Sequence, residues 1–280
     1  MNDYPDEYIL PVDAWIQTAV DWLVAEWRPA FQVMRWPIAK FLDLVNDGLS
    51  AVPFWLFIIL LLFAAWRLSG WKNAVLAAGS FTLIAMMGLW DQSMKTLAIV
   101  LTAVVFGVLT GVPLGVLAAR SDRFWTVLRP VLDLMQTTPS FVYLVPVVML
   151  FGIGTVPGVI ATIIFSLPPM IRLTNLGIRQ VPLEATEAGE AFGTTEWQSL
   201  VHIRFPLALP SIMAGLNQTL LLAMVMSVIA SMIGAEGLGL TVLRGIGRLD
   251  VGLAAIGGGA IVLMAITLDR LTQSFAEKPQ

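Results

Sequence analysis

The chain of 280 residues has no cysteine and a single histidine, His202. Without cysteine, disulfide bonds, thiolate metal sites and cysteine nucleophiles are excluded. No second histidine accompanies His202, so we assign it a structural role and expect no metal site. The sequence also lacks a Gly-x-x-x-x-Gly-Lys-Ser/Thr loop. The chain therefore does not bind ATP in the P-loop manner, and we expect no cofactor.

Charged side chains are scarce too. They make up 12% of the residues, whereas hydrophobic ones make up 58%, and the mean hydropathy is +0.83. Soluble domains carry about 25% charged residues. A net charge of −3 offers no basic surface to nucleic acid. The N-terminus lacks the basic-then-apolar order of a cleaved signal peptide, so we expect whole insertion. The composition predicts an all-α polytopic membrane protein.

Intervals with few charges are the expected membrane spans, and each needs roughly 20 residues to cross the hydrocarbon core. A turn signal at residues 152–158 divides one long charge-free stretch into two spans. The seven expected transmembrane helices lie near residues 53–68, 74–90, 96–118, 139–152, 157–174, 207–233 and 251–268. No ionisable residue lies away from the ends of these spans, which argues against a proton- or ion-coupled transporter.

A tryptophan-rich segment precedes the spans. Apolar and polar residues alternate at helical spacing over residues 12–27, and a second amphipathic piece covers residues 38–49. Pro29 and Pro37 are expected to break the pattern. Such helices lie flat at the membrane interface or pack on the outside of a helix bundle, and the sequence fits both arrangements.

Lysine and arginine are distributed unevenly, and loops rich in them stay in the cytoplasm. The opposite side has only Lys95, Arg244 and Arg248 in its loops, with three more basic residues in the N-terminal segment. The richer side receives Arg67, Lys72, Arg120, Arg123, Arg129, Arg172, Arg179, Arg204, Arg270 and Lys278. We expect this side to be cytoplasmic, with the N-terminus outside and the C-terminus inside.

One long polar interval, residues 181–210, separates strongly apolar ones. Residues 184–192 read as a short helix, Gly193 suits its end, and Thr194 or Thr195 begins a second helix that runs to Pro206. The small residues Ala188 and Gly189 are expected to let another protein approach the backbone. We interpret the interval as a docking surface for a soluble partner. A solvated connecting loop would explain the charges but not this pattern.

The same interval resembles a family signature. Glu187-Ala188-Gly189, then Gly193, then Ile203 to Pro206 are similar to the EAA loop of permease subunits of binding-protein-dependent ABC importers. This chain has Gly189 where the signature has alanine and Phe205 where it has leucine. Residues 132–146, 168–182, 215–218, 233–239 and 266–273 also resemble the glycine betaine, proline betaine and choline branch.

The resemblance implies a type I importer permease domain over residues 53–275, including a coupling loop at 181–206, after an N-terminal interfacial segment at 1–52. It implies a homodimer in the bacterial cytoplasmic (inner) membrane, two ATPase subunits and a periplasmic or lipid-anchored binding protein. ATP hydrolysis would then belong to the partner, not to this chain. The residues that the resemblance places at the ATPase are Glu184, Glu187, Ala188, Gly189, Gly193, Ile203 and Pro206.

A solute path is expected among uncharged polar and aromatic side chains of the spans. Quaternary ammonium heads have no hydrogen-bond donor and favour aromatic faces. The candidate lining residues are Gln136, Thr137, Thr138, Phe141, Tyr143, Asn217, Gln218 and Thr219. Alternatively, the polar ones are hydrogen-bond partners between helices. The sequence pattern is common to importers of glycine betaine, proline betaine, choline and carnitine.

Two other classes of function fit the sequence less well. A stand-alone secondary transporter or channel for small polar solutes would need no partner, but it usually needs ionisable groups within the spans. A membrane scaffold would not need the helix-and-glycine pattern of residues 181–210.

Overall fold

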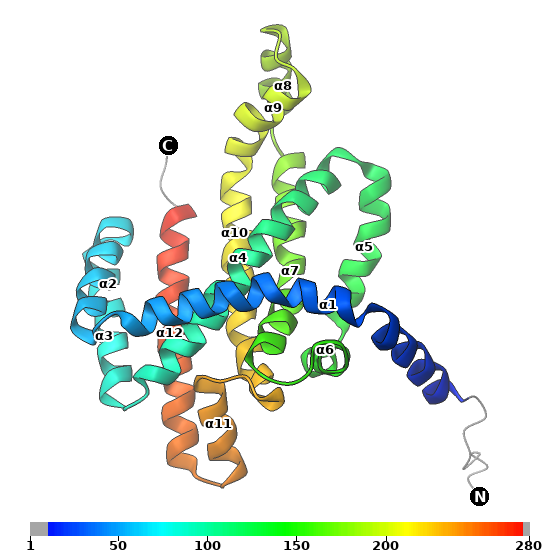
Figure 1. Ribbon diagram of the computed structural model, residues 1–280. Helices are drawn as coiled ribbons and strands as arrows, with labels where there is room; N and C mark the ends of the chain where they lie inside the picture. The colour runs from blue at the N-terminus through cyan, green and yellow to red at the C-terminus, as the bar shows by residue number, and fades with distance from the viewer. Residues whose placement is uncertain (1–10, 277–280) are drawn as a thin grey trace, which may run out of the picture.

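The computed structural model describes residues 11–276, and every regular element in that range is helical. The elements are α1 (Val12–Ala51), α2 (Phe54–Ser69), α3 (Trp71–Met86), α4 (Trp90–Arg120), α5 (Asp122–Thr137), η1 (Ser140–Tyr143), α6 (Leu144–Phe151), α7 (Thr155–Arg179), α8 (Leu183–Ala191), α9 (Glu196–Ser199), η2 (Leu200–Arg204), α10 (Phe205–Ala230), η3 (Ser231–Ile233), α11 (Leu238–Gly247) and α12 (Val251–Ala276). Figure 1 shows α8 and α9 at one end of the molecule and α11 at the other.

The centre of the fold is formed by α4, α7 and α10, which pack along one another. Small residues allow the close approach. A Cβ added to Gly115 of α4 would lie 2.5 Å from the Cβ of Thr174, and one added to Gly177 of α7 would lie 2.6 Å from the Cβ of Ser211. Membrane helices associate through such small-residue contacts because lipid provides no hydrophobic drive between helices.

Among the described residues, four helical stretches are long and apolar enough to cross a membrane without a break: α4, α7, residues Glu196–Ile233 and Val251–Ser274. They correspond to four of the seven predicted spans. The predicted span at 53–68 becomes α2, which meets the preceding Pro29–Ala51 segment at 104°. The one at 74–90 becomes α3, whose 16 residues extend only about 24 Å. It ends early because Gly88 turns the chain with a φ of 73°.

The prediction that Pro37 interrupts the N-terminal segment is wrong. The helix α1 continues through Pro29 and Pro37 to Ala51, although its direction changes along the blue part of the chain in Figure 1. Neighbouring helices support the proline-containing stretch, because the Phe31 ring lies 5.5 Å from that of Phe151 and the Phe41 ring 5.8 Å from that of Phe106. Packing on the outside of the bundle, one of the two expected arrangements, is therefore present.

The chain segment that connects α4 to α7 also differs from the prediction. We expected a span at 139–152, but those residues form η1 and the eight-residue α6, which turn through 111° from α5. The segment that returns the chain alongside α7 is α5, as Figure 1 shows. Sequence analysis placed α5 in a loop because charged residues, among them Asp122, Arg129 and Asp133, interrupt its hydropathy.

Candidate functional site

Residues 182–204, here called the cap, project beyond the helix bundle at the end opposite α11 (Figure 1). The helix α8 runs through the glutamate-rich part and ends at Phe192. Gly193 then reverses the chain with a φ of 83°, a conformation that glycine adopts without steric cost. Backbone N–H groups of Gly193 and Thr194 donate to the carbonyls of Glu190 and Gly189 at 2.9 and 3.1 Å. The predicted glycine stop is therefore present.

The second helix of the cap begins at Thr195, one of the two predicted starts. Its hydroxyl accepts the Gln198 N–H at 3.3 Å, and the Gln198 side chain accepts the Thr195 N–H at 2.9 Å. This reciprocal arrangement is a capping box, which satisfies two backbone donors at a helix start. On the side toward α4, Glu196 forms an ion pair with Arg120 at 3.3 Å.

Gly189 has a different role from the predicted one. It is buried, and a Cβ at this position would collide with the Cδ1 atom of Ile203. The missing side chain therefore lets α8 pack against the chain's own η2 rather than against another protein. Ala188, by contrast, is exposed. Of the predicted small-residue face, only Ala188 is open to a partner.

The outer surface of the cap combines carboxylates with large apolar groups. Glu184 and Glu187 are exposed and have no ion-pair partner within residues 11–276. Phe192 is 92% exposed and Trp197 is 64% exposed. Exposure of two large apolar side chains to water is unfavourable in free energy. Such surfaces mark protein interaction sites.

The predicted helix stop at Pro206 is wrong. The chain runs as one helical stretch of 38 residues from Glu196 to Ile233. Its second segment, η2, is a π-helical turn over Leu200–Arg204, and Pro206 follows in the first turn of α10. Pro206 has no N–H to donate to the preceding turn, and it lies directly after the π-helical turn, where the α-helical hydrogen-bond pattern is already interrupted. Ile203 and Pro206 thus connect the cap to α10 instead of ending the cap.

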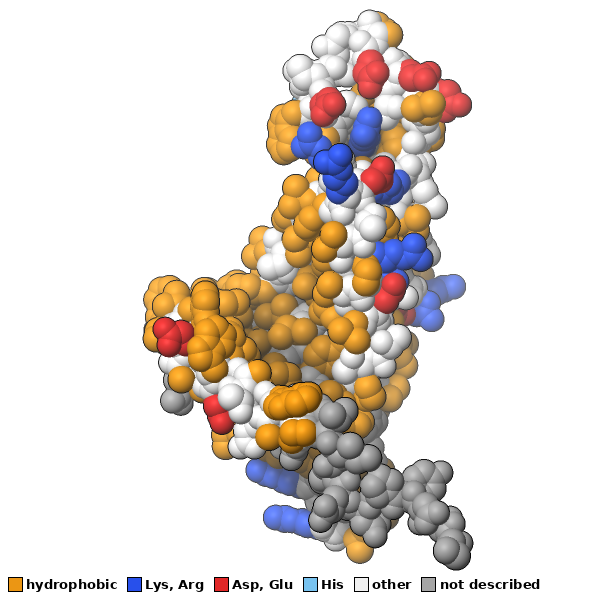
Figure 2. Space-filling view, turned by 90° about the vertical axis from the view of Figure 1, so that its right-hand side faces the viewer, with side chains coloured by type: hydrophobic (Ala, Val, Ile, Leu, Met, Phe, Trp, Pro, Cys, Tyr) orange, Lys and Arg blue, Asp and Glu red, His pale blue; other side chains and the backbone are white. Residues whose placement is uncertain are grey.

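A second feature is a polar stripe along α5, defined as Asp122, Thr126, Arg129, Asp133, Gln136 and Thr137, which are all exposed. These positions recur every three to four residues and share one face of the helix. Leu132, about 100° round the helix from Asp133, is buried at 1% exposure. Figure 2, which faces the α5 side, shows acidic and basic side chains continuing from the cap over the upper half of the molecule.

Ion pairs join this stripe to α7. Asp122 contacts Arg179 at 2.7 Å, and further along both helices Asp133 contacts Arg172. Arg129 lies 4.0 Å from Asp133. The sequence analysis did not predict these ion pairs, because it located the spans as charge-free intervals. The helical spacing of the polar residues between 122 and 137 was the signal that would have found them.

The predicted pathway residues fall into two sets. Gln136 and Thr137 belong to the polar stripe, and Phe141 is 59% exposed beyond the end of α5. Thr138 donates to the Leu134 carbonyl at 2.8 Å. The Tyr143 hydroxyl donates to the Met135 carbonyl, and its ring packs edge-on at 5.8 Å from that of Phe165.

The α10 set is placed differently. Asn217 donates to Asp269 at 2.9 Å and accepts from Thr272 at 2.6 Å, so its amide joins α10 to α12. This matches the alternative that polar side chains of the spans pair between helices. Thr219 is fully buried, and Gln218 is exposed.

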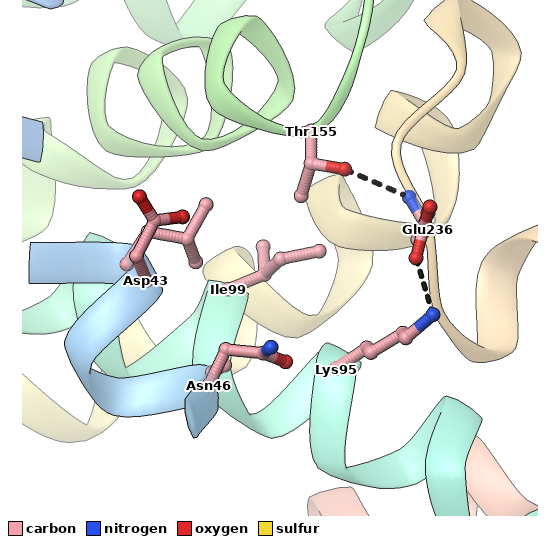
Figure 3. Close-up of a pocket in the computed structure, with 8 residues that line it drawn as sticks. Asp43, Asn46, Lys95, Ile99, Thr155 and Glu236 are labelled. Atoms are coloured by element: carbon pink, nitrogen blue, oxygen red, sulfur yellow. Dashed lines mark hydrogen bonds and ion pairs between the residues drawn. The ribbon is translucent and has the colours of Figure 1, made fainter. Parts of the chain in front are cut away.

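At the α11 end, the turn between η3 and α11 is fixed to two other helices. Figure 3 shows Glu236 paired with Lys95 of α4, while its backbone N–H donates to the Thr155 hydroxyl at 3.4 Å. The next hydrogen bond is buried: the Leu238 N–H donates to the Thr96 hydroxyl at 2.8 Å. A pocket of about 170 Å³ lies beside this turn, with α1 forming its other wall.

Comparison with known proteins identifies the class. The sequence model of the family described as "binding-protein-dependent transport system inner membrane component" matches residues 111–278, more than half of the chain. The chain belongs to this family. It is a multi-pass permease of the inner membrane, and the ATPase of such a transport system is a separate subunit. The alternative of a stand-alone secondary transporter or channel does not fit this membership.

Several curated relatives are similar to the permease over most of its length. The glycine betaine/proline betaine permease ProW of Escherichia coli is 53% identical over 95% of this chain and 75% of its own. The glycine betaine/carnitine permease GbuB of Listeria monocytogenes is 44% identical over 98% of both chains. The glycine betaine permease OpuAB of Bacillus subtilis is 42% identical over 96% of this chain and 95% of its own.

Solved structures with the same fold are ABC importer permeases. The inward-facing MetNI methionine transporter aligns with a TM-score of 0.58 at 22% identity, covering 69% of this chain and 95% of that one. An amino acid ABC transporter with histidines aligns with a TM-score of 0.58 over 70% of this chain and 96% of that one. The predicted type I importer fold is confirmed.

Proposed function

We propose that this permease forms the translocation pathway of an ATP-driven importer for quaternary ammonium compatible solutes such as glycine betaine, proline betaine or choline. The observation that carries the proposal is the 53% identity with ProW over 95% of the chain. The names of GbuB and OpuAB, which both include glycine betaine, point to the same class of substrate.

The cap is the proposed docking site for the ATPase subunit. Glu184, Glu187 and Ala188 present an exposed face, and Phe192 stands out beside it at 92% exposure. The other predicted coupling residues act from behind this face. Gly189 and Ile203 hold α8 against η2, and Gly193 sets the turn that aims Phe192 outward. Pro206 begins the helix that carries the cap.

The proposed orientation places the cap in the cytoplasm, where ATP is available. The unequal placement of basic residues supports it, since the α11 end has Lys95, Arg244 and Arg248, whereas the opposite end, with the cap, the α2–α3 junction and the C-terminal part of α12, has Arg67, Lys72, Arg120, Arg123, Arg179, Arg204 and Arg270. The N-terminus is then outside and the C-terminus inside. The exposed tryptophans of α1, which include Trp15, Trp22 and Trp36, suit an interfacial position for the segment 1–52.

Two copies of the permease are proposed to enclose the solute path. The polar stripe of α5 supports this arrangement, because ionisable groups at membrane depth need water or a protein partner. Gln136, Thr137 and Phe141 would line the path from α5 and η1, with Gln218 contributing from α10 and Tyr143 and Thr138 shaping the bend. A binding protein would deliver solute at the α11 end. ATP-driven movement of the caps would alternate the path between two openings.

Reconstitution tests this function. The permease is placed in proteoliposomes with the ATPase and the binding protein from its own genome, and uptake of radiolabelled glycine betaine is measured together with ATP hydrolysis. We expect solute to stimulate hydrolysis only when all three proteins are present. Stimulation without the binding protein, or no uptake of any quaternary ammonium solute by the complete system, would contradict the proposal.

A further inference from the structure

The ion pair between Asp133 and Arg172 joins α5 to α7 about one turn before the C-terminal end of α5. Asp133 is 11 positions beyond Asp122 on α5, a distance of about 16 Å along the helix axis. Its side chain is 51% exposed and that of Arg172 is 31% exposed, so both reach the open face of α5 and α7. At this depth, charged groups are costly unless they serve a path for polar solutes.

The pair leaves hydrogen-bonding capacity unused. The Arg172 guanidinium meets Asp133 through its terminal nitrogen, whereas its Nε atom is buried without a hydrogen-bond partner in the described part of the chain. A guanidinium offers a planar fork that binds a carboxylate through two parallel hydrogen bonds. Because Nε is buried, a solute can meet Arg172 only through its terminal nitrogens, and Asp133 has Arg129 as a second cationic neighbour at 4.0 Å.

From this geometry we propose that Asp133 and Arg172 form a subsite for zwitterionic solutes within the permease. The inference rests on the proposed function and narrows its substrate class. A solute with one carboxylate and one quaternary ammonium group carries the complementary pair of charges. Its carboxylate takes the terminal donors of Arg172 while its cationic head faces Asp133, so neither charge is left unpaired. A purely cationic solute such as choline satisfies Asp133 but is repelled by Arg172.

Aromatic groups border the same region. The Tyr143 hydroxyl donates to the carbonyl of Met135, two residues beyond Asp133, so η1 folds back toward the end of α5. Phe141 lies on the same turn and is 59% exposed. An aromatic ring of η1 supplies a cation–π contact for the methylated head, which gains little from hydrogen bonding.

The test uses the permease–ATPase complex in nanodiscs without binding protein. Glycine betaine and choline are titrated separately, and binding is followed by ligand-observed NMR. We expect the wild-type complex to bind glycine betaine more tightly than choline. In Arg172→Gln the betaine affinity should fall about three- to fivefold while choline affinity stays or rises, since one partly exposed charge pair is lost. In Asp133→Asn both affinities should fall, because each solute carries a cationic head.

The matched control is Asp122→Asn, which breaks the other ion pair between α5 and α7 and should leave the ratio of the two affinities unchanged. Should Arg172→Gln fail to assemble, the double variant Asp133→Asn/Arg172→Gln keeps a hydrogen bond between the two positions and should also lose the preference. An unchanged ratio in Arg172→Gln or in the double variant, unchanged affinities in Asp133→Asn, or no betaine binding by the wild type overturns the subsite even when the complete system imports betaine. Absence of that import overturns the proposed function itself.

Discussion

Gly189 of α8 and Ile203 of η2 are packed so closely that a Cβ on Gly189 would overlap the Cδ1 atom of Ile203. This contact holds the two arms of the cap together. Gly189→Leu should push α8 away from η2 and abolish uptake, with the protein still present in the membrane. Uptake of labelled solute and membrane abundance are both measured. Gly79→Leu is the control, because Gly79 of α3 has open space around it; equal loss in both variants would contradict the role of the contact.

Glu187 tests the docking face directly. Its side chain is exposed and has no ion-pair partner within residues 11–276, so Glu187→Arg removes nothing from the permease fold. Charge reversal at an interface weakens association by like-charge repulsion. We expect loss of uptake and of ATPase co-purification at normal permease abundance. The control Asp47→Arg changes an exposed carboxylate of α1 and should retain the ATPase. Normal co-purification with Glu187→Arg would remove Glu187 from the docking face.

Gly193 allows a graded experiment on the turn of the cap. Its φ of 83° costs an ordinary residue about 1–2 kcal/mol, whereas asparagine tolerates this region better. Uptake should therefore decrease from wild type to Gly193→Asn and further to Gly193→Arg, which should abolish it. Initial uptake rates at equal membrane abundance give the order. Equal rates in Gly193→Asn and Gly193→Arg would mean that backbone conformation is not what the position requires.

The polar stripe of α5 predicts which positions meet water. Because the chain contains no cysteine, single-cysteine variants need no background substitutions. Arg129→Cys and Thr137→Cys should react with a membrane-impermeant thiol reagent in inside-out vesicles. Val127→Cys and Val131→Cys, which are exposed on another face of the same helix, should be protected by lipid. Equal labelling of the two faces would contradict a water-lined stripe.

The turn at the α11 end predicts an order of stabilities. The Thr96 hydroxyl accepts a buried backbone N–H, so Thr96→Val leaves that donor unsatisfied at a cost of about 1–3 kcal/mol. The Lys95–Glu236 pair is 43% and 54% exposed, and exposed pairs contribute roughly 0–1 kcal/mol. Thermal unfolding in detergent should therefore show a larger loss for Thr96→Val than for Lys95→Met. The reverse order would assign the turn's stability to the ion pair.

The sequence predicted what depends on local pattern. Hydropathy located the apolar helices α4, α7, α10 and α12, and the turn at Gly193 and the helix start at Thr195 followed from residue chemistry. The prediction of α5 failed for a physical reason: charged and polar residues along one face lower the mean hydropathy of a helix over its length. The recurrence of these residues every three to four positions from Asp122 to Thr137 carried the information that the mean concealed.

Other features depend on contacts between distant segments. Pro37 lies within a continuous helix because α1 is supported by α4 and α6, and no local rule contains those partners. The burial of Gly189 is set by Ile203, 14 positions away in the sequence, so a small residue that was interpreted as an opening for a partner is an internal contact. The pairing of Asn217 with Asp269 likewise requires α12 to be in place.

The unbroken stretch from Glu196 to Ile233 has one more consequence. Its 38 residues make a rod of roughly 57 Å that starts in the cap and ends at the turn held by Lys95 and Thr96. Under the proposed coupling, a displacement applied at Trp197 would pass along this one helical stretch to the α11 end. The π-helical turn at Leu200–Arg204 is the place where the rod's backbone pattern changes, so the stiffness of these five residues would set how much of the displacement reaches that end.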